Sequence, residues 1–346
     1  MTGWGAGTER DAGTGRGRRA VRVRVPATSA NLGPGFDSLG LALSLYDDIE
    51  AWITDGGLSI EISGEGETLA DAGEQHLVVR AMRAGFAAFA DGQPPGIGLR
   101  CVNRIPHGRG LGSSAAAIVG GLLAAQALCG QERDQEPGDE ERPHEDLLEL
   151  ATALEGHPDN VAACLGGGLT IAWTVASGPR MVRLMPVPDI KPVICVAPAP
   201  VRTEVARKAL PDTVPHADAA ANAGRSALLI AALTQRPDLL FDATEDWLHQ
   251  DYRAEAMPDT HELVRAFRAA AIPAVVSGAG PSVLAFVNTD LDSVGSIVRE
   301  TGKAWHISPL DVARHGARLL RPPGFWVAGR RAIPLLRDTD GCEGMQ

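Results

Sequence analysis

Apolar and polar residues alternate over the first part of the chain, as they do in strands that bury one face. Residues 21–25 alternate valine with arginine, and Pro26 ends the run. The same reasoning predicts further strands over 41–52, 58–62 and 97–101. Apolar residues at helical spacing predict helices over 75–89 and 113–129. We therefore expect the N-terminal part of the chain to mix strands and helices.

A polar, acidic segment interrupts this pattern in the middle of the chain. Residues 131–145 read QERDQEPGDEERPHE, which predicts a solvated insertion between helices. Helical spacing resumes over 146–155 and ends before Pro158. A second region, richer in helix, is predicted to begin near Lys191. Its expected elements are an apolar run at 192–197, helices over 220–234, 237–250 and 259–270, and a strand, a turn and a strand across 274–287.

The length of the chain, 346 residues, exceeds what a single hydrophobic core usually supports, so we expect two domains. The first is predicted at residues 21–188, with the acidic segment as a flexible insertion, and the second at 189–320. Residues 1–20 are rich in glycine and arginine and lack the apolar run of a secretory signal, so a disordered tail is expected. The extension at 321–346 receives no assignment.

Charge and composition narrow the possible functions. The net charge of -11 argues against a general nucleic-acid binder, because phosphate binding requires a basic face. An anionic ligand would therefore be held locally. The longest apolar stretch, 115–129, is shorter than a membrane span, and we expect a cytoplasmic protein without membrane association. The 5 cysteines never form a CxxC pair, which favours reduced, mostly buried thiols over disulfides or a zinc site.

A glycine-rich segment between a predicted strand and a predicted helix is the first candidate for chemistry. Residues 106–117 read PHGRGLGSSAAA. Glycines let the backbone approach a ligand, and the start of the following helix offers unpaired N–H groups and the positive end of its dipole to an anion. The residues predicted to hold the phosphates of a nucleotide are Pro106, His107, Gly108, Arg109, Gly110, Leu111, Gly112, Ser113, Ser114, Ala115 and Ala116.

The residues around this glycine loop exclude several nucleotide sites. A Walker A loop needs a lysine directly before serine or threonine, whereas the lysines of this chain are Lys191, Lys208 and Lys303. A Rossmann loop would follow the first strand of a βαβ unit, and the VAIK, HRD and DFG motifs of protein kinases are absent. A glycine-rich turn that merely connects a strand to a helix is as common as one that binds a nucleotide, so the loop alone does not decide the function.

Four motifs in order carry a family resemblance. Residues 26–40 (PATSANLGPGFDSLG), the glycine loop, residues 155–160 (EGHPDN) and residues 277–282 (SGAGPS) resemble the motifs of the GHMP small-molecule kinases, and the first and third are close to those of the homoserine kinase branch. The resemblance covers residues 21–320. It implies an α+β GHMP kinase fold, with an N-terminal ribosomal-protein-S5-like nucleotide-binding domain and a ferredoxin-like C-terminal domain. It also implies a homodimer that uses ATP and Mg²⁺ to phosphorylate the side-chain hydroxyl of L-homoserine, giving O-phospho-L-homoserine in threonine biosynthesis.

The resemblance also assigns residues to the substrate. Asn31 and Asp37 flank a glycine–proline turn, and Asp37 is expected to bind the amino group of homoserine. From the residues alone, both could be ordinary Asx-turn residues. Arg207 and Arg253 are expected at the substrate carboxylate, since a planar guanidinium binds a carboxylate through two hydrogen bonds. The full set is Asn31, Asp37, His157, Asn160, Thr203, Arg207, Arg253 and Gly278.

By the same resemblance, magnesium is predicted at Ser114 and Glu149, because the ion prefers hard oxygen ligands and shares its shell with phosphate oxygens and water. Glu155 is the rival carboxylate, since it lies nearer the 155–160 loop. Ser113 is expected on the phosphates, although both serines could merely be N-caps. No residue is a secure general base, so catalysis is predicted to rely on positioning by Asn160, Asp37 and Ser114.

Pro158 is expected to break the preceding helix, so that His157 and Asn160 project from a loop near the substrate carboxylate and the reacting hydroxyl. Two other functions stay open. Other GHMP kinases act on mevalonate, shikimate or diphosphocytidyl-methylerythritol, which lack the amino-acid pair of ammonium and carboxylate. A regulator that kept the fold and lost turnover would be expected to lack Ser114, Glu149 or Asn160, yet all are present.

Overall fold

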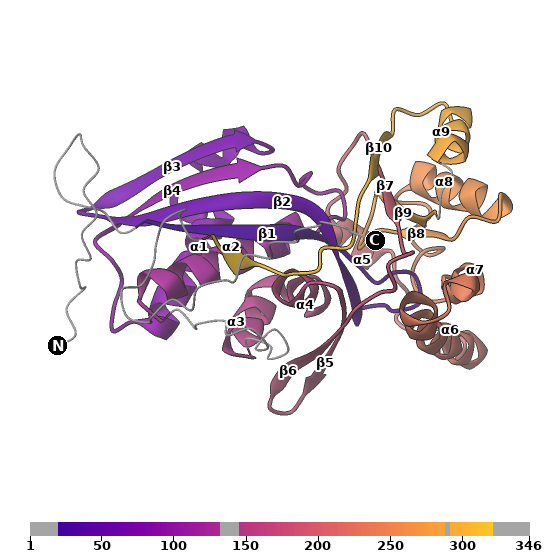
Figure 1. Ribbon diagram of the computed structural model, residues 1–346, viewed down its shortest axis with the longest axis horizontal. Helices are drawn as coiled ribbons and strands as arrows, with labels where there is room; N and C mark the ends of the chain where they lie inside the picture. The colour runs from indigo at the N-terminus through magenta and orange to yellow at the C-terminus, as the bar shows by residue number, and fades with distance from the viewer. Residues whose placement is uncertain (1–19, 132–144, 288–290, 321–346) are drawn as a thin grey trace, which may run out of the picture.

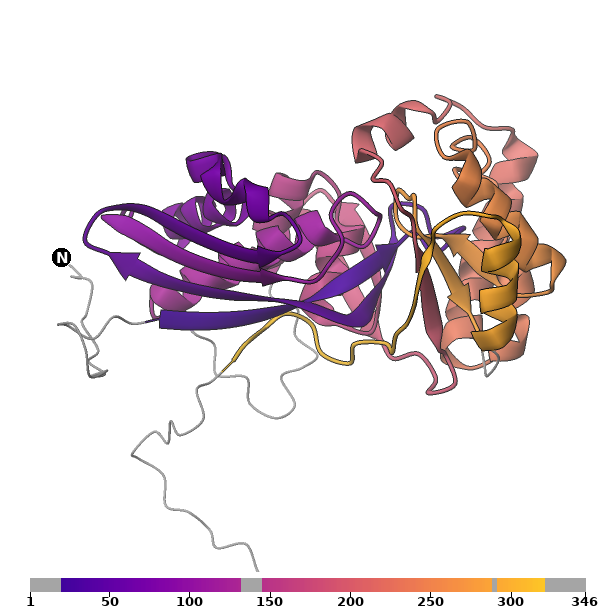
Figure 2. The same ribbon diagram turned by 90° about the horizontal axis from the view of Figure 1, so that it is seen from above.

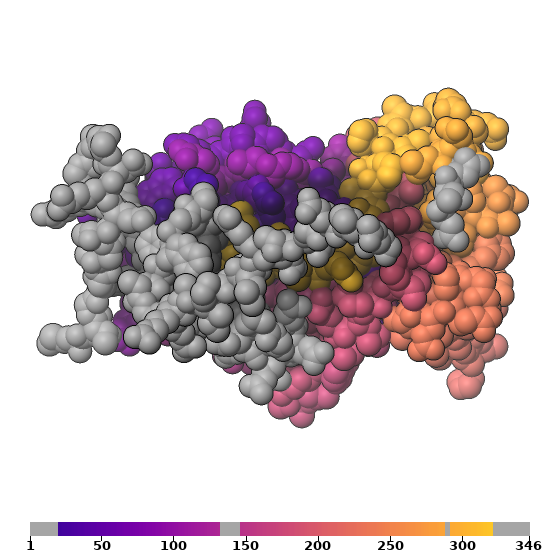
Figure 3. Space-filling model, in the orientation of Figure 1, coloured from indigo at the N-terminus to yellow at the C-terminus, as the bar shows by residue number. Residues whose placement is uncertain are grey.

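The computed structural model describes residues 20–131, 145–287 and 291–320. The tail, the acidic insertion and the C-terminal extension predicted from the sequence lie almost entirely outside these ranges. The molecule is elongated, and its two regions lie side by side along the long axis (Figure 3).

The first region is built on a sheet of seven strands (Figure 1). Its main path runs in the order β11-β1-β2-β4-β3, while β5 pairs with the start of β2 and β6 pairs with β5. Neighbouring strands are antiparallel except for the parallel pair β3 and β4. The strands are β1 (Ala20–Ala30), β2 (Leu39–Thr54), β3 (Gly57–Gly64), β4 (Gly96–Asn103), β5 (Leu169–Val175), β6 (Gly178–Leu184) and β11 (Arg318–Leu319).

Helices cover one face of this sheet (Figure 2). They are α1 (Leu77–Phe89), which follows a 3-10 helix at Glu67–Gln75, α2 (Ser113–Leu128), α3 (Glu145–Glu155) and α4 (Asp159–Gly166). The central helix, α2, is buried along most of its length because its residues are small or apolar on every side. Gly120 lets it approach the sheet, since a Cβ there would lie 2.4 Å from Cδ1 of Ile49. This packing fixes the N-terminus of α2 and the glycine loop before it.

The second region is a four-stranded antiparallel sheet with helices on both faces (Figure 1). Alternate residues of a strand face opposite layers, so Val193 and Cys195 join the core formed with α8 and α9, whereas Ile194 belongs to the main core that includes α6. Burial on both faces explains the unbroken apolar run at 192–197. The elements are β7 (Pro192–Val196), α5 (Thr203–Lys208), α6 (His216–Thr234), α7 (Leu240–Ala243), α8 (Pro258–Ala269), β8 (Ala274–Val276), β9 (Val283–Phe286), α9 (Leu291–Glu300) and β10 (His306–Pro309), in the sheet order β10-β7-β9-β8.

The two regions meet through motifs that are far apart in the sequence. The N–H of Gly278 donates to the carbonyl of Ala30 at 3.1 Å, and the hydroxyl of Ser277 donates to the carbonyl of Gly110 at 2.7 Å. The chain then returns from the second region, so that β11 completes the first sheet beside β1. The first motif, the glycine loop and the SGAGPS motif therefore converge at the junction.

The α+β fold class is confirmed, and most predicted strands and helices are present. The helix predicted over 237–250 is wrong. Only a 3-10 turn at Pro237–Leu239 and the short α7 form there, because the Asp246 carboxylate accepts hydrogen bonds from the N–H groups of the next turn, including that of Gln250 at 2.7 Å. The elements that the pattern did not predict are the β5–β6 hairpin, α4, α5, α9, β10 and β11.

The cysteines of the described residues agree with the sequence analysis. Cys101, Cys164 and Cys195 are free and buried, and Cys129 is partly buried. Burial raises the pKa of Cys101 and that of Cys195 to about 12. These thiols are therefore protonated at neutral pH and suited to packing. Among the described helices, none has the length and apolar character needed to cross a membrane.

Candidate active site

The glycine loop joins β4 to α2 at the junction of the two regions. Gly108, Gly110 and Gly112 have positive φ angles of 66°, 72° and 67°, which glycine adopts at little cost. Gly110 also has no room for a side chain, since a Cβ there would lie 2.1 Å from the carbonyl oxygen of Ser277. Gly112, and neither serine, is the N-cap of α2. The loop thus brings backbone N–H groups next to the positive end of the α2 dipole.

A cavity of about 130 Å³ lies between the glycine loop and the second region. The predicted substrate residues that line it are Asn31, His157, Asn160, Thr203, Arg207, Arg253 and Gly278. Asp37 joins them through an ion pair with Arg207. The structure therefore brings together, from both regions, every residue predicted to contact the substrate.

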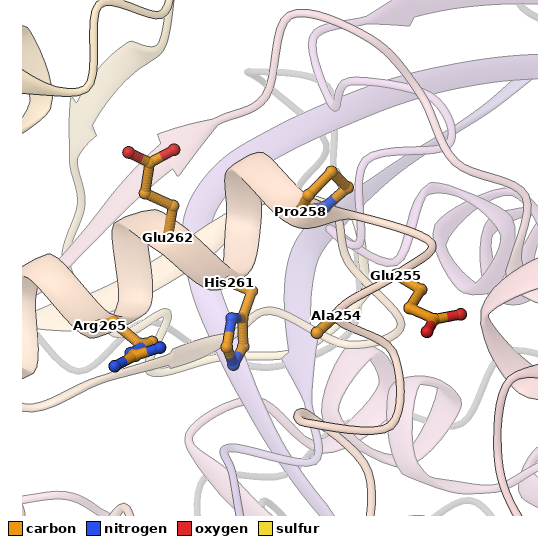
Figure 4. A pocket seen from close by; sticks show the side chains of 6 residues that line it. All are labelled: Ala254, Glu255, Pro258, His261, Glu262 and Arg265. Carbon is orange, nitrogen blue, oxygen red and sulfur yellow. The ribbon is translucent and has the colours of Figure 1, made fainter.

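A wider and shallower hollow of about 490 Å³ lies elsewhere, on α8 and the turn before it (Figure 4). It is lined by Ala254, Glu255, Pro258, His261, Glu262 and Arg265, none of which was predicted for the site. His261 is engaged there with the exposed carboxylate of Asp251 at 3.0 Å. We therefore treat the cavity beside the glycine loop as the candidate active site.

Asp37 forms a two-pronged ion pair with Arg207, which lines the cavity. Nη2 of Arg207 lies 2.7 Å from Oδ1 of Asp37, and Nη1 lies 3.2 Å from Oδ2. Asn31 holds the loop that carries Asp37, because its Oδ1 accepts the N–H of Asp37 at 2.9 Å and its Nδ2 donates to the carbonyl of Gly278 at 2.8 Å. These contacts give Asn31 the turn-stabilising role that its residue type suggested. Asn31 also lines the cavity.

Arg253 is buried, with 1% of its surface exposed. Its Nε donates to the carbonyl of Ala206 at 3.2 Å, and Nη1 lies 3.0 Å from Nδ1 of His249. Burial, together with the charge of Arg207, lowers the pKa of Arg253 to about 10. It is therefore still a cation at neutral pH, held in the wall of the cavity by uncharged acceptors.

Ser114 is paired with Glu155, the rival carboxylate, and not with Glu149 of the predicted magnesium pair. The Ser114 hydroxyl donates to Oε2 of Glu155 at 2.6 Å. Glu149 instead lies beside the β5–β6 turn, where a Cβ on Gly178 would be 3.9 Å from its carboxyl carbon, and it does not line the cavity. The two glutamates are six residues apart on α3, so they point in different directions. Burial raises the pKa of the Glu155 carboxyl above its usual range, despite the hydrogen bond from Ser114.

His157 and Asn160 also line this cavity. Nδ1 of His157 lies 2.7 Å from Oδ1 of the buried Asp159. Burial lowers the pKa of His157, but the hydrogen bond and charge of Asp159 outweigh it, so the pKa is raised overall. Asn160 was expected in a loop and lies instead in the first turn of α4. Its Oδ1 accepts a hydrogen bond from the hydroxyl of Thr28 at 2.8 Å.

Comparison with known proteins agrees with this geometry. Residues 76–168 match the family model described as GHMP kinases N terminal domain, and residues 224–304 match GHMP kinases C terminal. The chain is 53% identical over 301 residues to a homoserine kinase of Streptomyces avermitilis, covering 87% of this chain and 96% of that one. The chain belongs to the GHMP kinase family. A homoserine kinase of Clavibacter michiganensis is 55% identical over 267 residues, covering 77% of this chain and 82% of the relative.

Solved structures support the same family. The crystal structure of homoserine kinase from Cytophaga hutchinsonii superimposes on this GHMP kinase with a TM-score of 0.75 at 26% identity, covering 90% of this chain and all (100%) of the other. The family resemblance and the assignment as an enzyme are thereby confirmed.

Residues that the sequence analysis missed also surround the glycine loop of this GHMP kinase. A second cavity, of about 260 Å³, also borders Ser113 and Ser114 and is lined by apolar residues such as Ile49 and Val78 together with polar ones such as Asp47. His76 also lines it; the side chain is 8% exposed, and Nδ1 has no hydrogen-bond partner among the described residues. The sequence offered no signal for His76, because it lies outside the matched motifs.

Proposed function

We propose that this GHMP kinase is a homoserine kinase, which transfers the γ-phosphoryl group of ATP to the side-chain hydroxyl of L-homoserine. One observation carries the proposal: the guanidinium groups of Arg207 and Arg253 line one small cavity beside the glycine loop, and the carboxylate of Asp37 is bound to Arg207. An amino acid bears an ammonium and a carboxylate group on the same carbon, which these charges complement. Mevalonate and shikimate have no ammonium group to pair with Asp37.

Bound homoserine would separate Asp37 from Arg207 and form an ion pair with each of them. Its ammonium group would take the place of Arg207 at Asp37, and its carboxylate would bind Arg207 and Arg253. His157, whose raised pKa favours the cation, would add a further positive group. The side-chain hydroxyl would then extend toward Asn160 and the glycine loop, where the γ-phosphate is expected.

The oxygen atoms of Ser114 and Glu155 fit magnesium, which prefers hard oxygen ligands and retains water and phosphate oxygens in its shell. When bound there, the ion would neutralise charge that develops on the β- and γ-phosphate oxygens. The residues of the chain would align the γ-phosphate with the reacting hydroxyl. The glycine loop would hold the phosphates through backbone N–H groups, and Thr28 would fix Asn160 so that its amide N–H₂ faces the reacting hydroxyl.

The second cavity is proposed to hold the adenine of ATP. Its apolar side chains could contact the faces of a base, and the buried Nδ1 of His76, which has no partner among the described residues, could hydrogen bond to its edge. Because both cavities border Ser113 and Ser114, the base and the substrate would each lie next to the phosphate loop. No general base is needed in this proposal, because phosphoryl transfer depends mainly on positioning and charge stabilisation.

A coupled assay of ADP release with homoserine, mevalonate, shikimate and serine tests the proposed function. Homoserine should support the highest kcat/KM, and serine should be poor because its hydroxyl is one carbon closer to the charged end. Faster turnover of shikimate or mevalonate would assign the chain to another branch of the family. No turnover of any alcohol would favour the regulator. The homodimer and the cytoplasmic location remain predictions, which light scattering and cell fractionation can test.

A further inference from the structure

Arg253 and Arg207 face the same cavity but have partners of opposite kinds. Arg207 is bound by the carboxylate of Asp37. The acceptors around Arg253 are the carbonyl oxygens of Ala206 and Gly278, at 3.2 and 3.4 Å, and Nδ1 of His249 at 3.0 Å. All three are uncharged when the imidazole is neutral. Arg253 is thus a buried cation whose charge has no direct carboxylate partner among the described residues.

The contacts of His249 fix its protonation. The side chain is fully buried, and Nε2 lies 2.9 Å from the carbonyl oxygen of Gly33, so Nε2 must carry the proton. Nδ1 then has a free lone pair and accepts a hydrogen bond from Nη1 of Arg253. Burial lowers the pKa of His249 and keeps the ring neutral. The ring also packs on Phe36, with centroids 5.2 Å apart.

Asp246 lies next to His249 but makes no hydrogen bond to the imidazole. Oδ1 of Asp246 is 3.7 Å from Nε2 of His249, which is too long for a hydrogen bond. The Asp246 oxygens instead accept the N–H groups of Leu248, His249 and Gln250, at 3.2, 3.0 and 2.7 Å. The Asp246 carboxylate therefore stabilises the local turn, and it lies next to Nε2 of the imidazole, whereas Arg253 contacts Nδ1.

We propose that His249 is a positioning residue, whose neutral imidazole orients the Arg253 guanidinium and leaves its positive charge available to the carboxylate of an amino-acid substrate. A buried charge is stable only with a partner, so a guanidinium held by neutral acceptors gains most from an incoming anion. An aspartate at position 249 would satisfy the same hydrogen bond but neutralise the charge. This inference rests on the proposed function.

The variants H249N and H249D test the inference as a matched pair. In both, an oxygen occupies nearly the place of Nδ1, and both lose the bond to Gly33, so they differ only in charge. We expect the KM for homoserine of H249D to exceed that of H249N by about tenfold or more, with little difference in the KM for ATP. Equal KM values for homoserine in the two variants would overturn the inference and leave His249 with a structural role alone.

A substrate analogue provides a second readout. In 2-amino-1,4-butanediol the carboxylate of homoserine is reduced to an alcohol. Wild type and H249N should prefer homoserine strongly, whereas H249D should lose most of that preference; an undiminished preference in H249D would count against the inference. The longer pair H249Q and H249E repeats the comparison should H249D fail to fold. Wild-type protein without homoserine activity would overturn the proposed function itself, which is a distinct result.

Discussion

The hydroxyl oxygen of Ser114 lies 2.6 Å from Oε2 of Glu155, which links the start of α2 to the end of α3. This contact places a hydroxyl and a carboxylate side by side next to the glycine loop. It makes Glu155, and not Glu149, the residue to test as the acidic magnesium ligand.

The variant E155Q should lower kcat by about 100-fold or more, because a neutral amide replaces the proposed anionic ligand, and metal-ion catalysis is worth several kcal/mol. The amide oxygen can still accept the Ser114 hydrogen bond, so the fold should persist. E149Q, on the same helix but outside the cavity, is the matched control and should keep nearly full activity. A magnesium titration in the coupled assay measures both. A larger loss in E149Q than in E155Q would restore the original assignment.

Glu155 should also make the metal-free protein less stable at neutral pH. Its pKa is raised in the folded state, so the folded form holds the proton more tightly than the unfolded form. Its contribution to the free energy of unfolding is therefore present at acid pH and is lost as the pH rises through the folded pKa. In EDTA, E155Q should melt above wild type at pH 8, and this advantage should shrink toward pH 4.5. If the melting temperature of E155Q instead rose further above that of wild type on acidification, the prediction would be wrong.

Homoserine binding should weaken as the pH rises through the raised pKa of His157. Below that pKa the imidazolium can attract the substrate carboxylate, and above it the attraction is lost, for a change in KM of about tenfold. The measurement is the KM for homoserine between pH 6 and 8.5, in wild type and H157N. The wild-type KM should increase across this range, and that of H157N should stay flat. Parallel profiles would remove His157 from the carboxylate site.

The variant D37N should raise the KM for homoserine by about 10- to 100-fold, which is the range for losing one hydrogen bond to a charged group. The kcat should change far less, because Asp37 is assigned to the ammonium group and not to the reacting hydroxyl. D48N is a suitable control, since Asp48 forms a comparable ion pair with Arg24 away from the cavity. A fall in kcat at unchanged KM would instead indicate a role in chemistry.

Gly112 should tolerate no side chain. Its φ is +67°, and a Cβ would lie 1.9 Å from Oγ1 of Thr28 and 3.1 Å from Oδ1 of Asn160. The left-handed conformation alone costs alanine about 1–2 kcal/mol, and displacement of Asn160 should lower kcat by about tenfold or more. Melting curves and kcat for G112A, beside G92A, test this. Gly92 has open space around it, so G92A should resemble wild type, and a G112A enzyme of normal kcat would refute the steric argument.

Local signals made much of the fold and site predictable. The glycine loop and α2 were predicted closely because the loop glycines, the helix start and the apolar run act within a few residues of one another. The residues proposed to bind the substrate were identified from short motifs that can be recognised in a single sequence, and the structure brings them together. Asp37 and Arg207 could be named in this way, but their direct pairing could not, since 170 residues separate them.

Tertiary contacts decided the remainder. Whether Glu149 or Glu155 faces the glycine loop depends on how α3 packs, and both fit its sequence. His249 lay inside an expected helix, and only the turn around Asp246 brings its ring between Gly33 and Arg253. His76 lines its cavity only because α1 packs beside the glycine loop. Such residues carry no signal of their own, because their partners are distant in sequence.

Arg253 is a buried cation with no direct carboxylate partner among the described residues, and this has a consequence for the lifetime of the protein. A buried charge without a counter-ion weakens the empty fold, and a ligand that binds only the folded state restores stability in proportion to its concentration. Degradation acts on transiently opened chains, so the half-life of this kinase would lengthen when homoserine is plentiful and shorten when it is scarce. Abundance of the enzyme would then follow the supply of its own substrate without a separate sensor.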